Sequence, residues 1–243
     1  MELTAVLGDF GSALGTQAVG VAVSSVLTAG AAGLRWWVVK RLPARRTWRY
    51  TNAQSLVIVV AASAVIDTGT YRRPTTGIGQ VRALAILAPT LTRAYRDVDL
   101  ERIRISSQHL GHELESDLLI LGGPKSNACA ALMLDQLTTR LPFAIHNHTV
   151  SWGVNSYEGT IEDGVIKSDV GYIVRVKNPF SINHRVVMVG GSHTHGTIAA
   201  ARWWVEHGGS RSIPQDVAVL VKANVLPGDH VAPPQVLHMA PVP

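Results

Sequence analysis

The sequence is poor in cysteine and in charged residues. Its one cysteine, Cys129, excludes an intrachain disulfide and suits a reducing compartment. Charged residues make up 16% of the chain, against roughly 25% in ordinary soluble domains. At 243 residues, 47% of them hydrophobic, the chain is still long enough to bury a core. Because Cys129 falls in an Ala-rich helical stretch, we expect a small buried side chain there.

The shortage of charge is concentrated near the start of the sequence. Residues 10–34 include no charged residue, and this stretch exceeds the roughly 20 residues that cross a bilayer as a helix. Basic residues cluster directly after it, from Arg35 to Arg49, beside Trp36 and Trp37. This order is typical of a single-pass membrane helix with a cytoplasmic basic flank and interfacial tryptophans.

We therefore predict a membrane-anchor helix and basic linker in residues 1–50, followed by a cytoplasmic ligand-binding domain in residues 51–243. The expected location is the cell membrane. Ser, Thr and Gln interrupt the apolar stretch, so a soluble core helix or an interfacial helix is the alternative. A cleaved signal peptide is not expected, because the first residues are acidic rather than basic.

The net charge of +5 is weak evidence for a nucleic-acid partner. Much of the excess lies between Arg35 and Arg49, and the two signs nearly balance elsewhere. A basic run beside an apolar segment indicates a membrane flank more often than a nucleic-acid site. We do not expect nucleic acid to be a partner.

The rest of the chain alternates apolar, β-branched runs with stretches of helical period. Pro89 is expected to kink or end the first of these helices. A repeated strand–loop–helix pattern predicts an α/β, Rossmann-like fold with a mostly parallel sheet. Alternation around Asp163-Gly164 adds an inserted β-hairpin. The expected strands lie at 55–63, 102–106, 117–121, 185–189 and 216–225, and the expected helices at 81–95, 128–140 and up to 206.

Three loops rich in glycine and small polar residues follow expected strands. Ligands of open parallel sheets bind beyond the carboxyl ends of the strands, and glycine lets the backbone approach an anion closely. We therefore expect the three loops to converge on one ligand pocket, with Asn178 at its border. The candidate ligand-binding residues are Asp67, Thr68, Arg72, Arg73, Thr76 and Gly77 in the first loop, Gly122, Gly123, Pro124, Lys125 and Asn127 in the second, and Gly190, Gly191, Ser192, His193, His195, Gly196 and Thr197 in the third.

Each loop has a chemical interpretation and a structural one. Arg72 and Arg73 suit a phosphate, because guanidinium pairs with it through two hydrogen bonds, but they also suit an exposed loop with solvated charges. Asn127 is placed to cap the following helix, which does not exclude anion binding nearby. The second loop lacks the GxxxxGK[ST] spacing of a Walker A loop.

The histidines raise the question of a metal. His146 and His148 form one HxH pair, and His193 and His195 form another, so a site of four histidines is conceivable. Contact between the loop backbone and a ligand is the preferred interpretation. We therefore expect neither a metal nor a cofactor, and the sequence singles out no catalytic residue.

At VMVGGSHTHGTIAAA the chain resembles the SLOG superfamily, Rossmann-like domains whose strand–GG–GT–helix loop binds nucleotide-derived ligands. The GGP turn after Leu121 is similar to another glycine turn of that group. The resemblance implies a phosphate loop formed by Gly190, Gly191, Gly196 and Thr197. Members include phosphoribohydrolases and non-catalytic sensors in bacterial defence systems, some joined to membrane helices. This sequence has no glutamate after Thr197, where the hydrolases place a catalytic carboxylate, so the resemblance favours binding.

The leading hypothesis is a membrane-tethered sensor that binds a nucleotide or a nucleotide-derived signal in the cytoplasm. The rival is a hydrolase that cleaves an N-glycosidic or phosphate bond, with Asp67, His193 or His195 as acid or base. A third interpretation is a structural or interaction domain whose glycines serve turns alone. The sequence leaves enzymatic activity undecided and is compatible with a homo-oligomer.

Overall fold

The computed structural model describes residues 35–106 and 110–243. The chain divides into two compact units, Met1–Leu42 and Pro43–Pro243. The sheet, its covering helices and the clefts all belong to the second unit.

The described part of the first unit is helical. A short π-helix, η1, spans Trp37–Arg41, and α2 (Leu42–Trp48), which belongs to the second unit from Pro43 on, follows it. The predicted anchor helix at 10–34 lies outside the described residues. Among the residues that the structure describes, no helix is both long and apolar enough to span a membrane.

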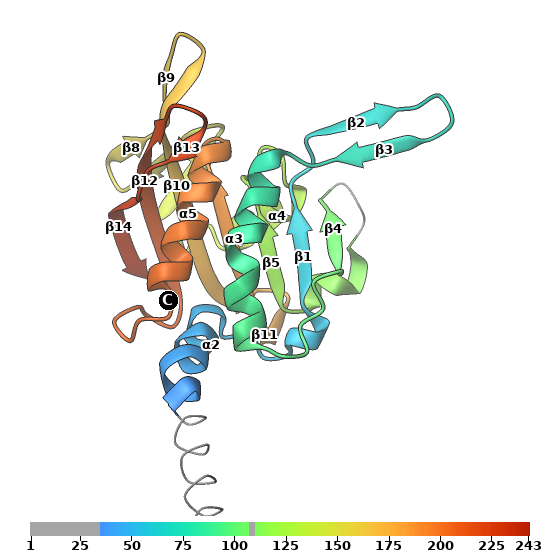
Figure 1. Ribbon diagram of the computed structural model, residues 1–243, viewed down its shortest axis with the longest axis vertical. Helices are drawn as coiled ribbons and strands as arrows, with labels where there is room; N and C mark the ends of the chain where they lie inside the picture. The colour runs from blue at the N-terminus through green and yellow to red at the C-terminus, as the bar shows by residue number, and fades with distance from the viewer. Residues whose placement is uncertain (1–34, 107–109) are drawn as a thin grey trace, which may run out of the picture. The chain divides into compact units, whose positions relative to one another are not determined.

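A nine-stranded sheet is the centre of the second unit (Figure 1). Along the sheet the strands follow the order β13 (His230–Val231), β12 (Val217–Leu226), β10 (Val165–Asn178), β11 (Ser181–Gly191), β5 (Leu118–Leu121), β1 (Val57–Val60) and β4 (Ile103–Ile105). In addition, β14 (Gln235–Pro241) pairs with β12 and β9 (Thr160–Glu162) pairs with β10. The remaining short 3-10 helices are η2 (Ala53–Ser55) and η3 (Gly111–Glu115).

The sheet is mixed, with a parallel half and an antiparallel half. Strands β4, β1, β5 and β11 run parallel to one another, as expected for a Rossmann-like arrangement. Strand β10 is antiparallel to both β11 and β12. Only Pro179 and Phe180 separate the paired residues Asn178 and Ser181, and so short a connection can join only antiparallel strands. The expectation of a mostly parallel sheet therefore holds for the half that carries β1, β5 and β11.

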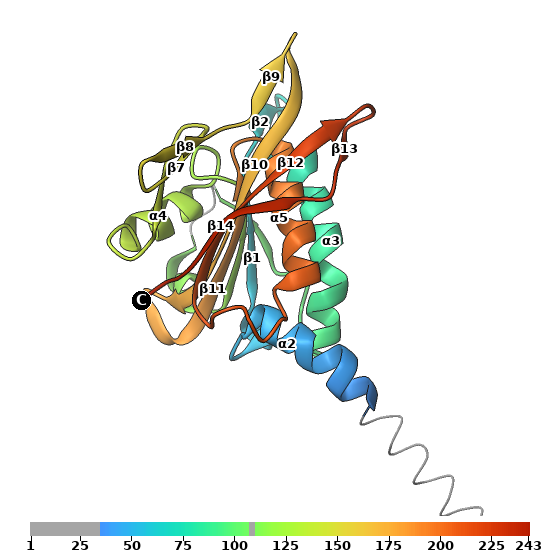
Figure 2. The same cartoon turned by 90° about the vertical axis from the view of Figure 1, so that its left-hand side faces the viewer.

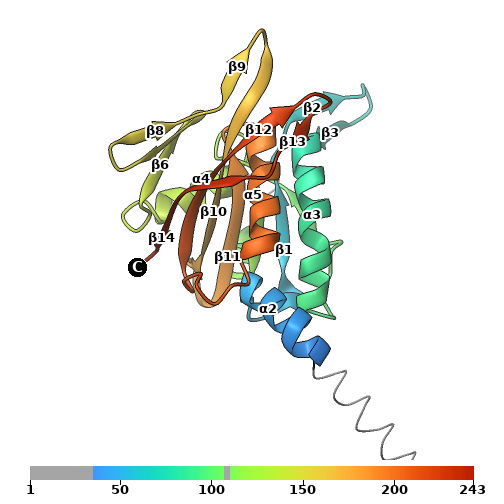
Figure 3. The same cartoon turned by 60° about the vertical axis from the view of Figure 1, so that its left-hand side comes forward.

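Both faces of the sheet are covered, which explains the unbroken apolar sequence of its central strands. Helices α3 (Ile78–Ala94) and α5 (Thr194–His207) pack on one face, with Ile58 and Val60 of β1 (Figure 2). Helix α4 (Ala128–Gln136) packs on the other face, with Val57 and Val59. A small sheet of β6 (Phe143–His146), β7 (Thr149–Trp152) and β8 (Asn155–Tyr157) lies on the α4 side (Figure 3).

Helix α3 is longer than the sequence suggested. Pro89 lies inside it, and the helix continues to Ala94 rather than ending early. Cys129 of α4 is buried, as expected, and burial raises the pKa of its thiol to about 12. This environment suits a packing residue rather than a nucleophile.

Two hairpins leave the sheet. The predicted turn between β9 and β10 is confirmed, because Asp163 and Gly164 both have positive φ, at 51° and 74°, as a type I′ turn requires. The second hairpin, β2 (Ala64–Asp67) with β3 (Arg72–Thr75), occupies part of the region expected to be a polar loop. It projects from the sheet and is largely exposed (Figure 1).

Arg175 on β10 is a fully buried cation that ties α2 to the sheet. Its guanidinium donates hydrogen bonds to the carbonyl oxygens of Thr47 (2.8 Å), Pro214 (2.5 Å) and Gln215 (2.9 Å) and lies 4.9 Å from the centre of a Trp204 ring. Burial lowers the pKa of Arg175 to about 9. Since α2 precedes residue 51, the packing of this unit includes residues before the expected domain start.

The first turn of α5 lies directly against the backbones of β10 and β11. A Cβ atom at Gly196 would lie 2.1 Å from the carbonyl oxygen of Val170, and one at Gly171 would lie 2.0 Å from the carbonyl oxygen of Gly196. At Gly191 a Cβ would lie 2.5 Å from the amide nitrogen of Thr197. Backbone atoms cannot yield as a side-chain tip can, so these glycines are required for close packing.

We expect Gly196→Ala to lower the free energy of unfolding by about 3 kcal/mol, the upper part of the range for overpacking. Gly77→Ala is the matched control, because a Cβ there would meet only the side-chain ends of Gln80 and Ser63. Urea unfolding of the full chain measures both. Equal stability of the two variants would contradict the backbone contact.

Candidate functional site

A cleft of about 550 Å³ lies where the parallel strands β1, β5 and β11 end. Its border includes the residues after β1 with the start of α3, the loop after β5, and the loop between β11 and α5, together with the turn between β6 and β7 and Ile166 of β10. Such a position is where ligands of open α/β sheets bind. The three glycine loops thus meet, as the sequence analysis expected.

About a third of the candidate residues line this cleft. Gln80, just after the first loop, and Ser126, in the second loop, line it as well. Ser63, Asn147 and Thr194 also border it, and no ligand contact was expected at any of them. His148 was expected only as a conceivable metal ligand with His146, His193 and His195, and it lies in the turn between β6 and β7, where it stacks on His193. The candidates that line the cleft are Gly77, Gly123, Lys125, Gly191, Ser192, His193 and Thr197.

The arginine loop does not line the cleft. Asp67 and Arg72 form an exposed ion pair, 3.5 Å between Oδ2 and Nε, on the projecting β2–β3 hairpin. Arg73 lies beside them, also exposed. The Thr68 hydroxyl donates to the carbonyl oxygen of Tyr71 and so serves the hairpin turn. The alternative of an exposed loop with solvated charges describes these four candidates better.

Several candidates near the cleft hold its walls in place. The Thr76 hydroxyl donates to the carbonyl oxygen of Ala61, 2.8 Å away. The Asn127 side chain accepts from the amide of Ala130 at the start of α4, which confirms the expected cap. Gly122 has a φ of 106°, which a side chain would strain. Gly190 lies against the ring of Tyr172.

Three further candidates lie away from the cleft. Pro124 borders a separate cavity beside α4 and β6. His195 points toward Asp229, with 3.6 Å between Nε2 and Oδ1. Asn178 lies at the end of β10 that is remote from Gly191, where its amide donates to the carbonyl oxygens of Leu114 and Ser116.

A chain of basic side chains crosses the cleft. The ammonium of Lys125 donates to Nε2 of His148 over 2.8 Å, and Nδ1 of His148 donates to the carbonyl oxygen of Ser192 over 2.7 Å. Because Nε2 accepts and Nδ1 donates, this pattern requires the neutral imidazole with its proton on Nδ1. The His148 ring stacks on His193, with ring centres 4.5 Å apart and planes 5° from parallel.

Asp169 of β10 is the buried acid beneath this chain, and the sequence analysis missed it. Its Oδ2 accepts the amide of Gly196 (2.5 Å), and its Oδ1 accepts the amides of Val170 (2.8 Å) and His193 (3.2 Å). Oδ1 also lies 3.3 Å from Nδ1 of His193. Asp169 therefore caps the start of α5 and puts a negative charge where the resemblance implied a phosphate.

The three helices that begin at the cleft differ in their caps. Asp169 caps α5 and Asn127 caps α4. The N-cap residue of α3, Gly77, has no side chain with which to cap the helix, and Gly77 and Gln80 border the cleft. The positive end of the α3 dipole therefore lies at this part of the cleft, which favours an anion there.

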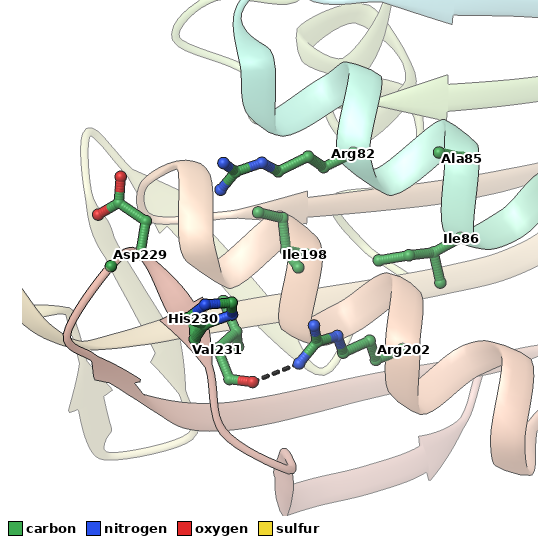
Figure 4. A pocket seen from close by; sticks show the side chains of 9 residues that line it. Arg82, Ala85, Ile86, Ile198, Arg202, Asp229, His230 and Val231 are labelled. Carbon is green, nitrogen blue, oxygen red and sulfur yellow. Dashed lines mark hydrogen bonds between the residues drawn. The ribbon is translucent and has the colours of Figure 1, made fainter.

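A second cavity, of about 390 Å³, lies between α3, α5 and the loop before β13 (Figure 4). Ile86 and Ile198 are among its apolar walls. Figure 4 shows the Arg202 guanidinium bonded to the carbonyl oxygen of Val231. Since Asp229 borders the same cavity, an anion would meet both signs of charge there. The cleft at the strand ends is the better candidate site.

The described residues include no group of three or more His, Cys, Asp or Glu side chains placed to hold a metal ion. No family model matches the chain, and no curated protein sequence is significantly similar to it. The site is therefore interpreted from its own geometry.

We expect Asp169→Asn to lower the free energy of unfolding by about 2 kcal/mol. The asparagine amide nitrogen cannot accept a hydrogen bond, so one of the amides of Gly196 and His193 loses its acceptor in a buried place. Asp97→Asn, at an exposed position, is the control. Chemical denaturation compares the two, and an equal effect would show that Asp169 is not the cap of α5.

Proposed function

We propose that the cleft binds the phosphate of a nucleotide-like ligand. The observation that carries this proposal is the basic chain of Lys125, His148 and His193 in a cleft whose described lining includes no carboxylate. Lysine is a common phosphate ligand. Gly77 and Gly123 also line the cleft, and because they have no side chains a ligand can approach the backbone there.

Charge favours one end of the cleft for the phosphate. Asp169 occupies the amides at the start of α5 and would repel an anion placed there. Lys125 and the uncapped start of α3 at Gly77 attract one. The phosphate therefore lies toward α3 and the loop after β5, rather than in the loop between β11 and α5.

The size of the cleft supports a ligand larger than phosphate alone. A volume of about 550 Å³ falls within the range of small-molecule sites. Ala62 and Ile166 add apolar surface to the lining, which suits the less polar part of a nucleotide. Trp152 and Tyr172 offer no stacking surface in this cleft, because both rings pack on Phe143.

We further propose that the protein is a membrane-tethered sensor with this domain in the cytoplasm. The uncharged stretch at 10–34 and the basic run that follows it support the tether. Trp36 and Trp37 are exposed, at 47% and 40% of their surface, as interfacial anchors would be. A sensor needs a site for its signal, and the cleft at the strand ends provides one.

Lys125→Ala is expected to weaken binding of ADP about tenfold, because a charge-assisted hydrogen bond to phosphate is lost. Lys177→Ala is the matched control, since Lys177 is exposed at the far end of β10. Isothermal titration calorimetry on the detergent-purified full chain measures both, with AMP, ADP, ATP, cyclic AMP and NAD as the panel. The full chain is used because α2 contributes to the core.

Two results would overturn the proposed function. One is no heat of binding for any member of the panel. The other is binding that Lys125→Ala leaves unchanged, which would place the phosphate elsewhere.

A further inference from the structure

His193 is held at one nitrogen and open at the other. Its Nδ1 lies 3.3 Å from Oδ1 of Asp169, and the Asp169 side chain is 1% exposed. Within the described part of the chain, Nε2 of His193 makes no hydrogen bond, and the residue lines the cleft. A buried carboxylate on Nδ1 fixes the tautomer that leaves Nε2 as a proton acceptor.

The surroundings of His193 also hold its ring. The ring stacks on His148, which is itself bonded to Lys125 and to the carbonyl oxygen of Ser192. Gly159 lies close against the pair, since a Cβ there would be 2.9 Å from Nδ1 of His193. A base restrained on several sides is oriented before a ligand arrives, which is what acid–base catalysis requires.

We propose that His193 is the general base of a hydrolysis that cleaves a phosphorus–oxygen bond of the bound ligand, with Asp169 as its positioning residue. This inference rests on the proposed phosphate site. Asp169 comes from β10 and acts on His193, so it does not replace the catalytic carboxylate that the resemblance expects after Thr197.

The step consumes one water molecule. Nε2 of His193 takes a proton from water while the water oxygen forms a bond to phosphorus, and the bond from phosphorus to the leaving oxygen breaks. The leaving oxygen takes a proton from solvent, and His193 returns its own proton to solvent. Lys125 offsets the negative charge on the phosphoryl oxygens. The products are a phosphate and an alcohol, or two phosphates where the bond is an anhydride.

The lining favours this bond over an N-glycosidic one. Cleavage of a glycosidic bond develops positive charge on the sugar, and enzymes stabilise it with a carboxylate at the sugar. The carboxylate nearest the base, Asp169, is buried and bonded to the amides of Gly196 and His193. Among the described residues that border the cleft, none is an acid.

The full chain is assayed for release of phosphate from AMP, ADP and ATP and of p-nitrophenolate from bis(p-nitrophenyl) phosphate. His193→Gln is expected to lower the rate about 100-fold, the lower end of the effect of a general base. The affinity for ADP, measured by calorimetry on the same preparation, is expected to fall much less than the rate, because Lys125 still holds the phosphate. His146→Gln is the matched control, because His146 is exposed on β6 and does not border this cleft.

A second variant separates chemistry from structure. In His193→Gly, added imidazole is expected to restore part of the lost rate, because it supplies the missing base in the space left by the ring. A residue that only supports the loop would show no such rescue.

The outcomes distinguish this inference from the proposed function. Binding of ADP without hydrolysis of any probe overturns the inference and leaves the phosphate site standing. Hydrolysis that survives in His193→Gln, or release of a free base instead of phosphate, also overturns it. Absence of both binding and hydrolysis overturns the inference and the proposed function together.

Discussion

The contact between the first turn of α5 and the backbones of β10 and β11 is the constraint on which the rest of the site depends. Gly171, Gly191 and Gly196 let the two backbones meet with no side chain between them. Asp169 then reaches the amides of His193 and Gly196 from the neighbouring strand. Were the helix a side chain's width further away, the carboxylate would lose the amides that balance its charge. The same contact sets the position of the His193 ring.

Because of this contact, the glycines between β11 and α5 serve backbone packing rather than phosphate binding. In the resemblance to SLOG domains, the glycines after the strand make room for a phosphate. In this chain the space against Gly191 and Gly196 is filled by protein backbone, and the helix end is neutralised by a carboxylate. In the proposed site, the groups that attract an anion are therefore Lys125 and the start of α3. The third loop instead presents an imidazole, which is suited to moving a proton.

Much of the fold could be predicted because its signals are local. The runs VIVV and LLIL are apolar on both faces and form buried parallel strands, and Asp163-Gly164 forms the expected turn. The antiparallel half was missed because the hairpin around Asp163-Gly164 was predicted as an insertion, whereas its second strand, β10, lies in the main sheet between β11 and β12. Strand β14 was not expected because the tail is rich in proline. As an edge strand, β14 tolerates proline.

The site was predictable only in part, because some of its residues are brought together by contacts that are distant in sequence. Glycines and polar residues after strands identified the loops that meet, including Lys125 and His193. Asp169 is the one acid in β10, and nothing in the local sequence shows that the start of a helix supplies its hydrogen-bond donors. His148 is brought in by the turn between β6 and β7, which both lie outside the main sheet. Arg72 and Arg73 resemble a phosphate clamp in sequence, yet pairing of their strand with β2 carries them away from the cleft.

The central claim is that charge directs the phosphate to the α3 side of the cleft. Amide NMR of the isotopically labelled full chain, titrated with ADP, tests it most directly. We predict that the amide signals of Gly77, Gly79 and Gly123 shift on titration while that of Gly196 stays in place, because Asp169 already occupies it. A large shift at Gly196 with none at Gly77 or Gly123 would contradict the account.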